Sequence, residues 1–126
     1  MTRFLLDSDI LMDFLKKKRE AVELIVKLSK EGWLSASILS VTELRAGWNE
    51  NQAKFFLPRL YMLVTIENLT LEIAELAGHF RQEYKLKGIN LPAIDTLIAA
   101  TAIVGDWQLV TGNKKDYPMS QLKFYQ

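Results

Sequence analysis

The sequence predicts an α/β domain of three layers (α/β/α), in which helices cover both faces of a parallel sheet of four to five strands. Short apolar runs without polar alternation recur along the chain, which is typical of strands buried on both faces. Segments with apolar residues at helical spacing separate these runs, and strands that alternate with helices favour a parallel sheet. The 126 residues, 49% of them apolar, suit one domain with a real core, so we expect residues 1–126 to form a single domain.

The first third of the chain supplies two of these strands. A continuous apolar run at residues 4–6 stops at Asp7, and we expect the first strand there. Ser8 is expected to cap a helix through residue 15. A second helix is predicted over 20–30, ending at a glycine, and a second strand over 33–37.

The middle of the chain is predicted to hold two helices and a strand. Ser40 and Glu43 have the spacing of a capping box, so a helix is expected to start at Ser40. Residues 49–62 are predicted to be helical in part, with a break at Pro58. The apolar and β-branched residues 63–66 form the third predicted strand.

The last third begins with a long amphipathic helix predicted over residues 70–87, acidic early and basic late. Residues 95–104 are almost wholly apolar, which predicts a buried helix. A fourth strand is expected at 108–111, then a loop or short helix over 112–118. Residues 122–125 are a possible fifth strand at an edge of the sheet.

Acidic residues adjoin several of these core elements. Asp7 follows the first strand, Glu43 lies at a helix start, Asp95 opens the buried helix, and Asp116 comes just after the fourth strand, near Asn113. In open parallel sheets, ligands bind at the carboxyl ends of the strands. If the ends of the first and fourth strands lie side by side, these groups meet in one cleft.

Such a cluster of carboxylates requires a cation. Two carboxylates about 4 Å apart repel by roughly 4 kcal/mol at an effective dielectric constant near 20, so three or four do not stay ionised together alone. Mg²⁺, or Mn²⁺ in its place, suits carboxylate oxygen ligands. These ions activate water and stabilise the charge of a reacting phosphate, so the chemistry indicated is phosphodiester hydrolysis.

Each acidic residue also has a purely structural interpretation. Asp7 can be a turn residue, Glu43 half of a capping box, Asp95 an N-cap and Asp116 a loop residue. Caps and turns are the commonest roles of these residue types, so only their joint placement favours a site. His79, the one histidine, has no partner at ligand spacing, and we expect a packing or surface role.

Composition restricts the choice of partners and compartment. With 16 basic and 15 acidic residues, the chain has no general attraction for nucleic acid or membranes, although Lys114 and Lys115 adjoin the proposed cleft. The absence of cysteine is compatible with a reducing cytoplasm. No apolar run approaches the roughly 20 residues needed to span a bilayer, and aspartates interrupt any signal peptide. We therefore expect a cytoplasmic protein without a membrane partner.

Four segments resemble, in order and spacing, the motifs of the PIN domain family, and more narrowly those of VapC-like ribonuclease toxins of toxin-antitoxin pairs. No single motif is specific, but together they cover essentially the whole chain. They are residues 5–11, with the first strand and its aspartate; 40–44, with the glutamate; 92–100, the central aspartate helix; and 109–117, the final strand and loop.

The resemblance implies a Mg²⁺-dependent endoribonuclease that cleaves RNA. Asp7 and Asp95 would be direct metal ligands, Glu43 would hold a ligand or a metal-bound water, and Thr111 would orient the site by hydrogen bonding. It also implies a homodimer and a small cognate antitoxin whose segment occupies the cleft.

Two positions depart from the family's pattern. Asp9 stands where asparagine is common, which adds negative charge near the metal or takes over an orienting hydrogen bond. Asn113 stands where many members have a fourth aspartate, so either Asn113 or Asp116 completes the site. Two other functions stay open at this stage. One is a nuclease of RNA maturation or DNA repair on the same fold, and the other is a non-catalytic binding module with a vestigial acidic cluster.

Overall fold

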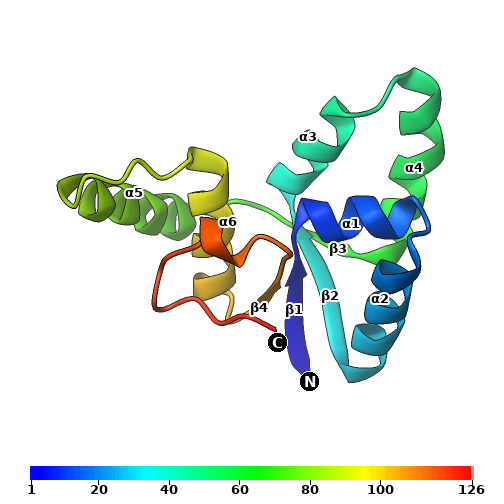
Figure 1. Ribbon diagram of the computed structural model, residues 1–126, viewed down its shortest axis with the longest axis horizontal. Helices are drawn as coiled ribbons and strands as arrows, with labels where there is room; N and C mark the ends of the chain where they lie inside the picture. Colours follow the sequence, from blue (N-terminus) through cyan, green and yellow to red (C-terminus); the bar gives the residue numbers. More distant parts are fainter. Residues whose placement is uncertain (126) are drawn as a thin grey trace.

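Figure 1 shows the computed structural model, which describes residues 1–125, with strands at the centre and helices on both sides. The strands are β1 (Thr2–Leu6), β2 (Gly32–Ser37), β3 (Thr65–Glu67) and β4 (Gln108–Val110). The helices are α1 (Ser8–Leu15), α2 (Arg19–Glu31), α3 (Ile38–Ala46), α4 (Glu50–Leu63), α5 (Leu71–Leu86) and α6 (Ala93–Val104), with a short 3₁₀ helix, η1 (Lys114–Asp116).

The sheet is parallel throughout and has the order β3-β2-β1-β4. In the pairing of β1 with β4, Leu6 lies opposite Val110. The next residue of β1, Asp7, continues the contact, because its N–H donates to the Val110 carbonyl at 2.9 Å. The ends of the first and fourth strands therefore lie side by side, which is the condition for the acidic groups to meet in one cleft.

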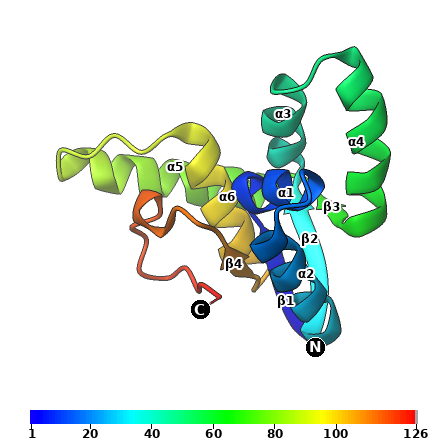
Figure 2. The same ribbon diagram turned by 45° about the vertical axis from the view of Figure 1, so that its right-hand side comes forward.

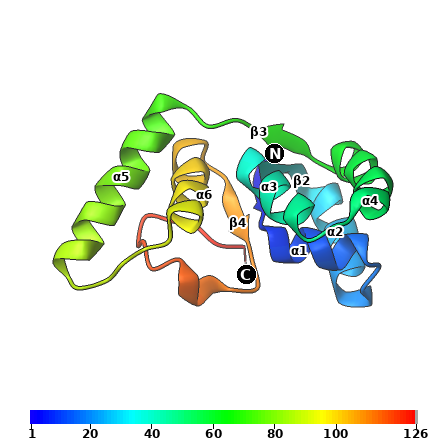
Figure 3. The same ribbon diagram turned by 90° about the horizontal axis from the view of Figure 1, so that it is seen from above.

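Two clusters of buried side chains cover the two faces of the sheet. On one face, Phe4 and Leu6 pack with residues of α1, α2, α3 and α4. On the other, Leu5 packs with residues of α5, α6 and the C-terminal segment. Figure 2 and Figure 3 show these two groups of helices on opposite sides of the strands. This arrangement confirms the predicted three-layer α/β/α fold.

The predicted caps of α1 and α3 are wrong by one and by three residues, respectively. Asp7, not Ser8, is the N-cap of α1. The strand β2 leads directly into α3, so Ser37 at the end of the strand becomes the cap, its hydroxyl accepting from the Leu39 N–H at 3.1 Å. Ser40 is therefore buried inside α3 and forms no capping box with Glu43.

The buried helix α6 starts at Ala93, with Pro92 as its N-cap. The fixed φ of proline, here −60°, suits the chain just before a helix. Asp95 accordingly lies in the first turn and is not the cap, which removes its purely structural interpretation as an N-cap.

Three further predictions fail in the periphery. The helix α4 continues through Pro58, which is exposed, so water can bond to the carbonyl that loses its N–H partner. This helix takes up residue 63, and β3 therefore starts at Thr65 instead. Within the described residues, 122–125 form no fifth strand, only an isolated parallel bridge between Leu109 and Phe124.

Across residues 1–125, the helices are too short or too polar for any of them to cross a lipid bilayer.

Candidate functional site

Asp7 lies at the point where the adjacent strands β1 and β4 end, and its side chain is only 6% exposed. The carboxylate accepts three hydrogen bonds. Oδ1 accepts from the Ser8 N–H at 2.9 Å. Oδ2 accepts from the Thr111 hydroxyl at 2.9 Å and from the Tyr117 hydroxyl at 2.7 Å. Asp7 is therefore a buried carboxylate whose orientation is fixed from two segments of the chain.

Asp9, in the first turn of α1, connects this helix to the loop after β4. Its Oδ2 accepts from the Gly112 N–H at 2.8 Å and from the Asn113 side-chain amide at 3.4 Å. A Cβ atom at position 112 would lie 2.7 Å from that oxygen, so any larger residue there would displace the Asp9 carboxylate. Burial, and to a smaller extent repulsion from Asp7, raises the pKa of Asp9.

Glu43 lies in the second turn of α3 and is half-buried. Its Oε1 accepts from the Ser8 hydroxyl at 3.1 Å, a contact between residues 35 positions apart. Burial raises the pKa of the Glu43 carboxyl, and repulsion from Asp7 and Asp95 raises it further. The hydrogen bond from Ser8 acts in the opposite direction.

Asp95 is half-buried in the first turn of α6, on the other side of the sheet from α3. Burial raises the pKa of Asp95, followed by repulsion from Asp7 and from Asp116. Asp116 itself is exposed at the end of η1. Repulsion from Asp7 raises the pKa of both Glu43 and Asp95, so both lie near Asp7, which follows β1 where it pairs with β4.

The charge of this cluster is uncompensated. Within residues 1–125, the five salt bridges use other acidic residues, and none involves the carboxylates at the cleft. In this range, no group of three or more histidine, cysteine, aspartate or glutamate side chains is already arranged as a metal-binding site. The donor set consists of oxygen atoms and carries excess negative charge, which fits a hard divalent cation.

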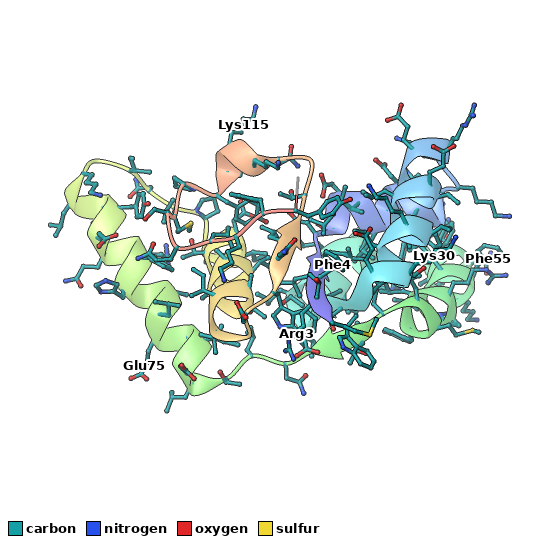
Figure 4. The ribbon with its side chains drawn as sticks, turned by 90° about the horizontal axis from the view of Figure 1, so that it is seen from below. Arg3, Phe4, Lys30, Phe55, Glu75 and Lys115 are labelled. Carbon is teal, nitrogen blue, oxygen red and sulfur yellow. The ribbon has the colours of Figure 1, made fainter. Side chains whose placement is uncertain are left out.

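Of the other residues singled out in the sequence, some contact the aspartates of the site and others lie away from it. Thr111 is buried and reaches Asp7 directly, while Asn113 reaches Asp9. His79 is exposed and lies 3.8 Å from Glu83, so the surface role expected for it is confirmed. Lys115 is exposed on η1 and points away from the body of the protein in Figure 4.

Two residues of the site were missed from the sequence. Ser8 was assigned to helix capping, yet its hydroxyl donates to Glu43. Tyr117 attracted no functional interpretation, yet its ring is 3% exposed and its hydroxyl donates to Asp7. The available signal for Tyr117 was chemical, because a buried tyrosine hydroxyl needs a hydrogen-bond partner.

Comparisons with known proteins agree with this geometry. The PIN domain family matches residues 4–123. Ribonuclease VapC10 of Mycobacterium tuberculosis is 35% identical over 120 residues, which cover 94% of this chain and 90% of that protein.

Two solved structures resemble the fold over nearly the full length of both chains. VapBC2 from Rickettsia felis, bound to a DNA fragment from its promoter, has a TM-score of 0.88 at 22% identity, covering 98% of each chain. A toxin-antitoxin complex from Klebsiella pneumoniae has a TM-score of 0.71 at 29% identity, covering 94% of this chain and 93% of that one. With the family matched from β1 to the C-terminal segment, the chain belongs to the PIN domain family.

Proposed function

We propose that this protein is a metal-dependent endoribonuclease and the toxin of a type II toxin-antitoxin pair. The observation that carries the proposal is the position of Asp7 at the paired ends of β1 and β4, with Glu43 bonded to the neighbouring Ser8 and with Asp95 near enough for repulsion from Asp7 to raise its pKa. The 35% sequence identity between this chain and ribonuclease VapC10 supports RNA as the substrate. An RNA substrate in turn favours the cytoplasm as the place of action.

Asp7 and Asp95 are the proposed direct ligands of Mg²⁺ or Mn²⁺, since Asp7 directly follows β1 and Asp95, in the first turn of α6, is near enough for repulsion from Asp7 to raise its pKa. A divalent ion held there supplies the positive charge that stabilises a reacting phosphate and activates water. Asp9 keeps the loop after β4 against α1 through Gly112, and Thr111 holds Asp7. For the fourth position the proposal favours Asp116, whose charge is near enough to Asp95 to raise its pKa. The alternative is Asn113, whose side-chain nitrogen donates to Asp9.

Glu43 is the proposed proton acceptor. Its Oε1 is engaged by the Ser8 hydroxyl, which leaves Oε2 to take a proton from water that enters the cleft. A carboxyl whose pKa is raised toward neutrality by burial and by neighbouring acids is a better general base than an ordinary glutamate.

Two exposed lysines, Lys114 and Lys115, precede Asp116 on η1. Cations at this position neutralise backbone phosphates without reading sequence. They favour a bound nucleic acid over a small phosphate ester, because a chain of phosphates extends beyond the acidic cleft.

The proposed antitoxin, a segment of which would occupy the acidic cleft, has a further candidate docking surface on the α1–α2–α4 side. A groove of about 830 Å³ is lined by apolar side chains that include Phe14, Val22 and Met62, with cationic side chains at its border. Met62 is 88% exposed, and exposed apolar grooves of this kind mark protein interaction sites. The toxin-antitoxin complex from Klebsiella pneumoniae supports such a partner.

We also propose a homodimer, to be checked by sedimentation of the purified chain.

The experiment that tests the function is RNA cleavage by the purified protein in Mg²⁺, with and without a chelator. Asp95→Asn is expected to lose at least about 100-fold of the activity, because it removes a carboxylate from the charge-stabilising cluster. Asp106→Asn is the matched control, since Asp106 is an exposed aspartate that pairs with Lys123 away from the cleft. Equal cleavage by the parent and by Asp95→Asn would contradict the mechanism.

The same assay separates the proposal from its alternatives. Comparison of single-stranded RNA, structured RNA and DNA distinguishes a toxin from a nuclease of RNA maturation or DNA repair. Absence of divalent-ion binding in a calorimetric titration would instead favour a non-catalytic binding module.

A further inference from the structure

Tyr117 stands outside the set of acidic residues and yet makes the shortest hydrogen bond to Asp7. Its hydroxyl lies 2.7 Å from Oδ2, and both residues are buried, at 3% and 6% exposure. The two residues are 110 positions apart in the chain. Tyr117 follows η1 and packs among the apolar residues on the α6 side of the sheet, with its ring against Phe124. The hydroxyl therefore reaches Asp7 from a fixed ring in the core.

The two oxygens of Asp7 differ in how much hydrogen-bonding capacity they retain. Each carboxylate oxygen has two lone-pair directions. Oδ2 accepts from Thr111 and from Tyr117, so both of its directions are used. Oδ1 accepts only from the Ser8 N–H, so one direction remains. Among the described residues, no further donor to Asp7 is present.

The geometry points to Tyr117 as a positioning residue that, together with Thr111, occupies Oδ2 of Asp7 and leaves Oδ1 as the oxygen available to a divalent cation. This inference rests on the proposed metal-dependent function and adds to it a residue and an atom. Tyr117 does not touch the substrate or the ion. It acts by fixing the plane of the carboxylate before any ion binds.

The chemistry of tyrosine suits this role. A tyrosine hydroxyl in this position donates a charge-assisted hydrogen bond, which is stronger than one between neutral groups. The ordinary pKa of a tyrosine hydroxyl is about 10, so the group carries its proton and can donate near neutral pH. Residues that orient a metal-binding side chain typically change metal affinity or activity by about 10–100-fold when they are replaced.

The chain offers a close control. Tyr84 also uses its hydroxyl to hold the C-terminal segment, donating to the carbonyl of Pro118 at 2.9 Å. This bond ends one residue from Tyr117 and does not involve Asp7. Tyr117 and Tyr84 both hold the C-terminal segment through their hydroxyls, and replacement by phenylalanine removes the hydroxyl from either residue. Only Tyr117→Phe removes a donor to Asp7.

The test is a calorimetric titration of the purified full chain and its two variants with Mn²⁺. Circular dichroism first checks that each variant is folded, and the retained phenyl ring preserves the packing against Phe124. We expect Tyr117→Phe to raise the Kd for Mn²⁺ by about 10-fold and Tyr84→Phe to leave it within about 2-fold. An unchanged Kd for Tyr117→Phe, or an equal rise in both variants, would overturn the inference.

A second readout uses the metal-free protein and separates this inference from the proposed function. In NMR spectra, the three-bond couplings of the Asp7 β protons report whether its side chain keeps one rotamer. We expect one rotamer in the parent and in Tyr84→Phe, and averaging in Tyr117→Phe. If the parent binds no Mn²⁺, the metal-dependent function fails and these couplings decide the positioning role alone. A single rotamer in all three proteins would then overturn it.

Discussion

Asp7 and the other two carboxylates of the acidic cleft are held differently. Asp7 is buried and receives three hydrogen bonds, from Ser8, Thr111 and Tyr117. In contrast, Glu43 and Asp95 are half-buried, and burial with repulsion from neighbouring carboxylates raises the pKa of each. The protein itself satisfies Asp7, whereas the described residues do not neutralise the charge of Glu43 and Asp95. This difference indicates that the fold fixes Asp7 and leaves Glu43 and Asp95 to be stabilised by a ligand.

Substitution of Asp7 is expected to have the largest effect on stability. Asp7→Ala is expected to lower the free energy of unfolding by about 3 kcal/mol, because it removes an N-cap and leaves buried hydroxyls without their acceptor. Urea denaturation of the metal-free protein measures this loss. The same truncation at Asp95 is expected to cost nothing, and a loss below about 1 kcal/mol at Asp7 would contradict the account.

Thr111 tests whether the support of Asp7 is shared. Its hydroxyl donates to Asp7 and accepts from the Asn113 N–H at 3.0 Å. Thr111→Val keeps the shape and removes both bonds, so we expect a loss of roughly 1–2 kcal/mol in the same denaturation experiment. Thr101→Val is the control, since the Thr101 hydroxyl donates to the Leu97 carbonyl of its own helix, at 2.8 Å, and not to a carboxylate of the cleft. Equal losses would mean that the bond to Asp7 has no special weight.

Substitutions of Glu43 and Asp95 are expected to raise stability, in contrast to substitutions of Asp7 and Thr111. Because their folded-state pKa values are raised, Glu43 and Asp95 bind protons more readily in the folded than in the unfolded protein. Their contribution to stability is complete below the ordinary carboxyl pKa and is lost as the pH rises through the folded-state pKa. Glu43→Gln and Asp95→Asn should therefore stabilise the metal-free protein at pH 7, by no more than about 1 kcal/mol after solvent screening. Thermal unfolding of the parent and the variants from pH 3 to pH 7 measures this gain in stability. A gain that persists at pH 3 would mean that the charge of these carboxylates is not its cause.

Ser8 is expected to give the smallest effect. Its hydroxyl bond to Glu43 is partly exposed, so Ser8→Ala should cost about 0.5 kcal/mol or less. Since that bond lowers the Glu43 pKa, its removal should raise the pKa further, which a carbon-detected NMR titration of the Glu43 carboxyl would show. A fall in the pKa would mean that Ser8 does not stabilise the ionised form.

The sequence was sufficient to predict the layers and the acidic edge of the sheet, because both depend on local patterns. The apolar run before Asp7 marks a strand that is buried on both faces, and the order of elements makes the sheet parallel. Helix starts were less accessible. Ser37 and Ser40 are both acceptable caps, and only the direct passage from β2 into α3 selects the first.

The support of the site was not predictable from the sequence for a different reason. Tyr117 and Ser8 act across 110 and 35 positions of the chain, and no local spacing encodes such contacts. Asp9 is an intermediate case. Its departure from the family's pattern was visible, but its bond to the Gly112 N–H depends on the close approach of α1 and the loop after β4.

The most direct test of the central claim compares the thermal stability of the parent and Asp95→Asn at pH 7, first with a chelator and then in saturating Mg²⁺. Without metal, Asp95→Asn should unfold at the higher temperature, because it lacks one repelling charge. With Mg²⁺, the parent should gain stability by ligand binding, about 2.7 kcal/mol at an ion concentration 100 times the Kd, and should become the more stable protein. If the order of the two proteins does not reverse, the carboxylates do not form a cation site and the account is contradicted.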